Sequence, residues 1–171
     1  MESFEKLVEV VARLRGEGGC PWDREQTHAT LKTTCIEEAA EVVCGINILK
    51  KTGNASNLCE ELGDLLLQVV MQAQIAEEEG LFTIDDVNRA ITEKMIRRHP
   101  HVFGEVTVSD TGEVLKNWEE IKKLEKKGKI DDDPYIYDAF DESVALIERA
   151  RQRKIEKRRK AAEEKTIKPQ C

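Results

Sequence analysis

Apolar residues recur along the chain at the spacing that places them on one face of a helix. The first stripe runs from Phe4 to Leu14 and stops at a glycine-rich stretch, residues 16–19. Residues 20–23 have the composition of a turn, and residues 31–49 are then free of proline and helically periodic. The pattern predicts a first helix, a flexible break and a second helix.

Polar residues around Gly53 end the second predicted helix, and Ser56 or Asn57 can cap a third helix that continues to about Glu79. The predicted core face of this third helix comprises Leu58, Leu62, Leu65, Leu66, Val69 and Val70. Because only a few residues connect the two helices, we expect them to form an antiparallel hairpin.

Further helices are expected in the C-terminal half of the chain. Thr83 and Asp86 have the spacing of a capping box, which predicts a fourth helix that continues to Arg98, where a His-Pro pair ends it. A fifth, shorter helix is predicted over residues 112–127. Residues 131–134 have the composition of a linker, and an amphipathic helix follows them.

This last helix becomes almost wholly charged in its second half. Its basic residues there are Arg149, Arg151, Arg153, Lys154, Lys157, Arg158, Arg159 and Lys160. Such a segment can attract RNA or acidic partners. The favoured interpretation is a solvated helix that docks on a partner subunit only at its start.

The composition supports a helical fold. Charged residues make up 36% of the chain and aromatic residues only 5%, which is unlike the composition of a sheet protein. A length of 171 residues suits one principal domain. We therefore expect an all-α helical bundle in residues 1–128, built on the hairpin, and a linker with a charged helical tail in residues 129–171.

Charge and cysteine content exclude several classes of function. The net charge of -7 argues against a surface that wraps nucleic acid, so nucleic acid is not an expected partner. The 5 cysteines form an odd set without a C-x-x-C pair, which favours reduced thiols over a disulfide framework or a zinc ribbon. No apolar run is long enough for a signal core or a membrane span, so we expect a soluble, cytoplasmic protein.

Two pairs of acidic residues have the spacing of neighbours on a helical face. Glu38 and Glu41 lie three residues apart in the second predicted helix, and Glu61 and Asp64 do so in the third. An antiparallel hairpin brings the pairs together, and two charges about 4 Å apart repel by roughly 4 kcal/mol at an effective dielectric constant near 20. A hard divalent cation relieves this repulsion, because oxygen ligands suit magnesium, manganese or calcium.

Other interpretations of the acidic residues stay open at this point. Each glutamate taken alone is most often an ordinary solvated residue. A di-iron site needs a Glu-x-x-His on each of two helices, and the chain offers only Glu25 with His28. The acidic face and the basic tail also suit a non-catalytic helical module that binds a regulator or a second subunit.

The motif that contains these acids resembles the all-α nucleoside triphosphate pyrophosphohydrolases. Its members here are Glu37, Glu38, Glu41, Glu61 and Asp64. The short acidic motif is also similar to that of dimeric dUTPases and phosphoribosyl-ATP pyrophosphohydrolases. Residues 20–28, 97–104 and 117–122 look like the MazG branch, and the resemblance covers about residues 4–125. Residues beyond 130 do not follow the second domain of longer MazG proteins.

The resemblance implies hydrolysis of nucleoside triphosphates between the α- and β-phosphates, which gives a nucleoside monophosphate and pyrophosphate and cleans the nucleotide pool. It implies Mg²⁺ as the cofactor, with Mn²⁺ as an alternative, and a homodimer or higher homo-oligomer that completes the bundle. A narrower dUTP or dCTP pyrophosphatase is the alternative within the same class.

Residue roles follow from motif position. Glu38, Glu41, Glu61 and Asp64 are expected to ligate the metal. Glu37 is a candidate to orient or deprotonate the attacking water together with Glu38 as a catalytic residue, although adjacent helical residues point about a hundred degrees apart. The candidate substrate-binding residues, cations for phosphate and polar or aromatic groups for the base, are Lys94, Arg97, Arg98, Asn117, Trp118 and Trp22.

Overall fold

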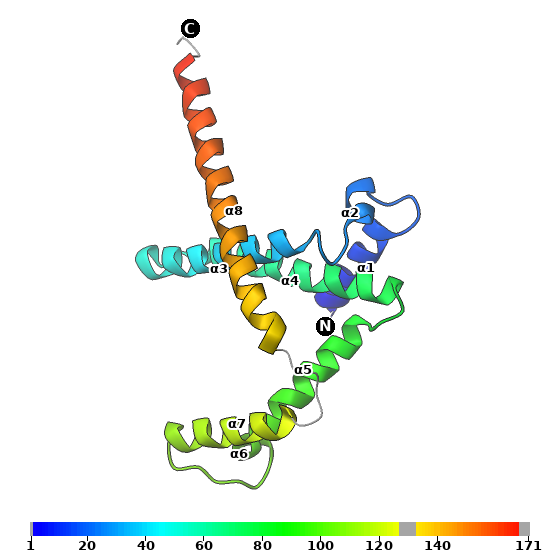
Figure 1. Cartoon of the computed structure of the whole chain (residues 1–171), viewed down its shortest axis with the longest axis vertical. Coiled ribbons are helices and arrows are strands. Elements are labelled where there is room, and N and C mark those ends of the chain that lie inside the picture. Colours follow the sequence, from blue (N-terminus) through cyan, green and yellow to red (C-terminus); the bar gives the residue numbers. More distant parts are fainter. Residues whose placement is uncertain (1, 127–132, 168–171) are drawn as a thin grey trace. The chain divides into compact units, whose positions relative to one another are not determined.

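A computed structural model describes residues 2–126 and 133–167, and every regular element within these ranges is a helix (Figure 1). The all-α expectation is thereby confirmed. The chain divides into two compact units, which are described separately below. Unit 1 comprises Met1–Ile75 and Tyr135–Cys171, and unit 2 comprises Ala76–Pro134. The predicted division into residues 1–128 and 129–171 stays a prediction.

Unit 1 begins with helices α1 (Glu2–Arg15) and α2 (Pro21–Glu25). The expected turn at residues 20–23 lies largely within α2, because Pro21 follows an extended Cys20 and has the fixed φ that suits a first helical turn. The guanidinium of Arg15 holds the two helices together, since its Nη1 donates to the carbonyl oxygens of Asp23 at 2.5 Å and of Gln26 at 3.1 Å.

Helices α3 (Lys32–Thr52) and α4 (Ser56–Glu78) follow, joined by a tight connection. Gly53 ends α3 with a φ of 73°, a left-handed conformation that glycine adopts without strain. The side chain of Asn54 caps α4, because its Oδ1 accepts from the backbone N–H of Ser56 at 2.8 Å. The prediction that Ser56 or Asn57 provides this cap was therefore wrong by a few residues.

The two helices run antiparallel, as predicted. Gly45 of α3 lies against Leu58 near the start of α4, and Glu38, further back along α3, lies beside acidic residues further along α4. A Cβ atom added at Gly45 would stand 2.8 Å from the Cα of Leu58. The absence of a side chain at this position therefore permits the close approach of the two backbones.

Burial along α4 differs from the predicted core face. Val70 is buried, but Leu62, Leu66 and Val69 are 50%, 40% and 42% exposed. The buried positions in the first part of α4 are instead Glu61 and Gln68, seven residues apart on one helical face. Because polar side chains occupy the covered face, the leucines of the other faces remain exposed in the single chain.

The other buried apolar residues of unit 1 come from several elements: Val11, Leu31, Met71, Ala73, Ile75, Leu146 and Ala150. The last two belong to α8 (Asp133–Ile167), which crosses α3 (Figure 1). An ion pair of 2.9 Å between Lys32 and Glu142 links the two helices. Residues 133–134 of the predicted linker are the first residues of α8, and residues 131–132 lie outside the described residues.

Unit 2 contains α5 (Ile84–Arg98), α6 (Pro100–Phe103) and α7 (Thr111–Lys126). The capping box of Thr83 and Asp86 is confirmed, with both reciprocal hydrogen bonds formed. The predicted end of α5 and the predicted α7 agree with the structure within one residue, and residue 127 lies outside the described residues.

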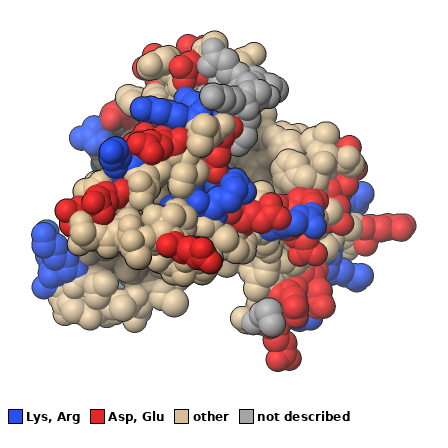
Figure 2. Space-filling view, turned by 90° about the horizontal axis from the view of Figure 1, so that it is seen from below, with Lys and Arg blue, Asp and Glu red and all other residues tan. Residues whose placement is uncertain are grey.

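No helix within the described ranges combines the length and apolar character that a membrane span requires. On the face of the molecule drawn in Figure 2, the described acidic and basic side chains are interspersed.

The close contact at Gly45 predicts opposite effects of the same substitution at two helical glycines. Gly45→Ala is expected to lower the free energy of unfolding by about 1–3 kcal/mol, because the new methyl group overlaps the backbone of α4. At Gly63, by contrast, no described neighbour lies within 4 Å of an added Cβ. Gly63→Ala is expected to raise this free energy by about 0.5–1 kcal/mol through helix propensity. Urea denaturation of both variants measures the difference, and equal effects would contradict the packing role of Gly45.

Candidate metal site

Three carboxylates from the helix hairpin converge in unit 1. Glu38 comes from α3, and Glu61 and Asp64 come from neighbouring turns of α4. One side-chain oxygen from each residue lies within 4.8 Å of the others. The hairpin therefore joins three of the four predicted metal ligands.

This cluster is partly withdrawn from solvent. Glu61 is only 9% exposed, and its Oε1 accepts a hydrogen bond of 2.8 Å from Nδ2 of Asn57. Among the described residues, no lysine or arginine forms an ion pair with Glu38, Glu61 or Asp64. Asp64 is exposed and Glu38 is half-buried. Negative charges held this close together without a cationic partner repel one another, so a positive ion would stabilise the cluster.

The pKa of Glu38 reflects the same unfavourable environment for negative charge. Burial of its carboxyl group raises this pKa above the ordinary value, and the negative charges of Asp64, Glu41, Glu61 and Glu37 raise it further. All five acids of the motif thus lie close enough to interact through their charges.

The donor set fits a hard divalent cation. Ligand oxygens that lie about 2.0–2.6 Å from one ion are at most about 5 Å apart, which agrees with the spacing in the cluster. Gln68, one turn beyond Asp64, has a buried Oε1 that lacks a hydrogen-bond partner within the described structure. The amide adds an oxygen donor to the same side of α4.

Glu41, the fourth predicted ligand, does not join this cluster. Its carboxylate forms an ion pair with Lys154 of α8, and that of Glu37 forms one with Arg153. The tail was expected to be solvated beyond its start, and Arg153 and Lys154 instead contact α3, although their side chains remain 56% and 57% exposed. These contacts could not be predicted from the sequence, because the tail contains many basic residues and no local pattern singles out Arg153 and Lys154.

Unit 2 contains the predicted phosphate-binding arginines. Arg97 and Arg98 at the end of α5 both bind Glu125 of α7, with shortest distances of 2.9 Å and 2.7 Å. Hydrogen bonds from Arg98 and then Arg97 lower the pKa of the Glu125 carboxyl group. Sequence reasoning missed Glu125, although its seven-residue spacing from Trp118 places both on one face of α7.

Trp118 is held within this cluster of unit 2. The guanidinium carbon of Arg98 lies 5.3 Å from the centre of the indole. The ring of His99 is edge-on to the indole, with 5.0 Å between the two ring centres. Nδ1 of His99 donates to the carbonyl oxygen of Met95 at 2.6 Å. These contacts give Trp118 a structural role in the described state.

The remaining predicted substrate contacts are dispersed. Lys94 and Asn117 are half-buried on α5 and α7 of unit 2. Trp22, on α2 of unit 1, is 61% exposed. The structure therefore does not bring the six predicted substrate-binding residues together within a single unit.

Comparison with known proteins places this site in a family. Residues 26–103 match the MazG nucleotide pyrophosphohydrolase domain, a range that includes the whole acidic motif. YabN of Bacillus subtilis, an uncharacterized protein, is 52% identical over 123 residues, which are 72% of this chain and 24% of that protein.

Two named enzymes are similar to the chain. The nucleoside triphosphate pyrophosphohydrolase/pyrophosphatase MazG of Thermotoga maritima is 51% identical over 126 residues, 74% of this chain and 46% of that protein. The nucleoside triphosphate pyrophosphohydrolase of Escherichia coli K12 is 45% identical over 130 residues, 75% of this chain and 48% of that protein. The chain thus spans about half or less of the length of these relatives. The chain belongs to the MazG nucleotide pyrophosphohydrolase family.

Proposed function

We propose that the protein hydrolyses nucleoside triphosphates to nucleoside monophosphates and pyrophosphate, with Mg²⁺ as the cofactor. The observation that carries this proposal is the cluster of Glu38, Glu61 and Asp64, which lies within the family-matched residues and lacks a cationic partner in the described structure. The names of the Thermotoga and Escherichia relatives support the choice of reaction.

The proposed metal ligands are Glu38, Glu41, Glu61 and Asp64, and Mn²⁺ is expected to substitute for Mg²⁺. A bound ion of this kind supplies charge neutralisation and polarisation of the phosphate groups. Glu41 can ligate the metal only if its carboxylate first releases Lys154. The helical framework of α3 and α4 orients the carboxylates before substrate arrives.

Glu37 is the proposed acceptor of a proton from the attacking water. The water oxygen forms a bond to the α-phosphorus, the bond from that phosphorus to the α,β-bridging oxygen breaks, and pyrophosphate leaves with the bonding electrons. Glu37 adjoins Glu38 in α3 and interacts with its charge, which supports this role.

Contacts of Lys94, Arg97 and Arg98 with phosphate, and of Asn117, Trp118 and Trp22 with the base, stay predictions. Arg97 and Arg98 can bind phosphate only by exchange with Glu125, since both guanidinium groups are paired with it. A dUTP- or dCTP-specific enzyme is the narrower form of the proposal, and a non-catalytic helical module is the alternative class.

We also propose that a second copy of the chain covers the exposed face of the hairpin. Val43 and Ile46 of α3 are 57% and 49% exposed, and Leu62, Leu66 and Val69 of α4 are exposed as well. Exposed apolar side chains gathered on two adjacent helices are typical of a protein–protein interface.

The first test of the activity compares two neighbouring glutamates of α4. The wild type is expected to release pyrophosphate and a nucleoside monophosphate. Hydrolysis rates on the eight common nucleoside triphosphates identify the preferred base. Glu61→Gln is expected to lower kcat by on the order of 10²–10³ because it removes one carboxylate of the cluster. Glu60→Gln, an exposed neighbour outside the cluster, is expected to retain activity.

Orthophosphate as the product would contradict the bond assignment. A wild type that shows no metal-dependent nucleotide binding by calorimetry would favour the non-catalytic module. Circular dichroism confirms that both variants retain their helices, so that a loss of activity reports on the site.

The raised pKa of Glu38 predicts a pH-dependent gain in stability for Glu38→Gln in EDTA. Above the ordinary glutamate pKa, ionised Glu38 destabilises the metal-free fold, so the variant is expected to melt at a higher temperature near pH 7. As the pH falls below that ordinary value, Glu38 is protonated in both folded and unfolded chains and the difference disappears. Calorimetric melting curves between pH 3 and 8 in EDTA measure the effect, because pH 3 lies about one unit or more below the ordinary glutamate pKa. Identical curves across this range would show that neither burial nor the neighbouring charges destabilise ionised Glu38.

The exposed hairpin face predicts an effect on assembly. Leu66→Glu is expected to shift the protein from dimer to monomer in sedimentation velocity, because the new charge would be buried in the interface. Val10→Glu on α1 is the control, since Val10 is 45% exposed and lies outside the hairpin. A monomeric wild type, or equal effects of both changes, would refute this interface.

A further inference from the structure

Two consecutive cations of α8 contact the acidic motif of α3. Arg153 forms an ion pair with Glu37, and Lys154 forms one with Glu41. The remaining acids of the motif have no lysine or arginine partner among the described residues. Helix α8 lies outside the family-matched residues 26–103.

A cleft of about 400 Å³ separates α3 from α8 beside these ion pairs. Its wall includes apolar side chains, among them Ile36 and Ile147. Its charged lining residues are Glu37, Glu41, Arg151, Lys154 and Arg158. The cleft thus has three cations and two carboxylates, and Arg158 has no acidic partner within the described parts of the chain.

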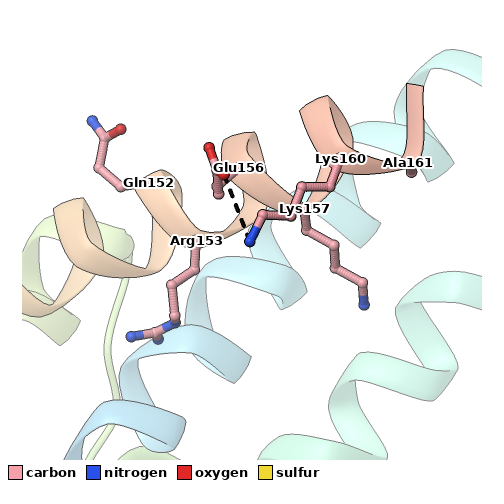
Figure 3. A pocket seen from close by; sticks show the side chains of 6 residues that line it. All are labelled: Gln152, Arg153, Glu156, Lys157, Lys160 and Ala161. Carbon is pink, nitrogen blue, oxygen red and sulfur yellow. Dashed lines mark ion pairs between the residues drawn. The ribbon is translucent and has the colours of Figure 1, made fainter. Parts of the chain in front are cut away.

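Cations continue along α8 on the side of Arg153. Figure 3 shows Arg153 extending from α8 toward the neighbouring helix, whereas Gln152 points the opposite way. Arg153, Lys157 and Lys160 line one hollow on the surface of α8. The dashed line in Figure 3 marks the ion pair between Lys160 and Glu156. The motif acids therefore face a helix whose nearby surface is mainly basic.

We propose that Lys154, assisted by Arg153, binds the phosphate chain of the nucleotide and occupies Glu41 and Glu37 only while nucleotide is absent. This inference rests on the proposed function. Glu41 lies one helical turn from Glu38, so an ammonium group at Glu41 lies near any ion that the cluster holds and near phosphate oxygens bound to that ion. Ammonium and guanidinium groups exchange readily between carboxylate and phosphate oxygens, because both are charged acceptors of similar hydrogen bonds.

The exchange predicts opposite effects of Lys154 on two ligands. Without nucleotide, Lys154 competes with a divalent ion for the carboxylate of Glu41 and adds positive charge beside the ion. With nucleotide, the phosphate oxygens separate the two positive charges and attract both. Lys154 therefore weakens the binding of metal alone and strengthens the binding of the metal–nucleotide complex.

The experiment is isothermal titration calorimetry on the full chain with two probes. One probe is Mg²⁺ alone, and the other is a methylene-bridged α,β-analogue of the best substrate in excess Mg²⁺. Lys154→Gln is expected to weaken analogue binding by about tenfold or more and to tighten Mg²⁺ binding. Lys154→Arg, which keeps the charge, is expected to retain most of the analogue affinity.

Lys32→Gln is the matched control, because it removes an ion pair between α3 and α8 that lies outside the acidic motif, that with Glu142. If Lys154 only fastens α8 to α3, both variants weaken analogue binding alike, and this result would overturn the proposal. Analogue affinity that is unchanged in Lys154→Gln would also overturn it. A wild type that does not bind the analogue with Mg²⁺ would instead refute the proposed function itself, so the two failures are distinguishable.

Discussion

Mutual repulsion among the carboxylates of the α3–α4 hairpin is the interaction on which the site depends. Gly45 allows the two backbones to approach so closely that Glu38 meets Glu61 and Asp64. Partial burial of the Glu38 carboxyl group raises its pKa, and the neighbouring negative charges raise it further. Such a cluster has no cationic side chain among the described residues, so its charges destabilise the fold, and the proposed divalent ion would relieve this repulsion.

The acids on the two sides of α3 differ in whether they have basic partners. The side toward α4 has no basic partner among the described residues, whereas Glu37 and Glu41 on the side toward α8 have Arg153 and Lys154. Helix α8 therefore neutralises the outer acids and leaves the inner cluster negative. Helix α8 lies outside the family-matched residues 26–103, which contain all five acids of the motif.

The same kind of pairing organises the other unit. Glu125 binds two adjacent arginines, and one of them, Arg98, stacks against Trp118. Each guanidinium retains its planar arrangement of donors while paired, so phosphate can replace the carboxylate without a new geometry. Preformed cationic groups of this kind cost little conformational entropy when a polyanionic ligand binds, since their side chains are already ordered.

Local interactions allowed the sequence to predict much of this protein. The helix periodicity, the capping box of Thr83 and the spacing of the acids in the hairpin all depend on residues a few positions apart. Only the tertiary structure could show that α4 buries Glu61 in place of its leucines, that Glu125 holds both arginines, and that α8 reaches the motif. Arg153 is 116 residues from Glu37 in the chain. Helical periodicity specifies which side chains share a face, but which distant face covers it depends on how all the helices pack together.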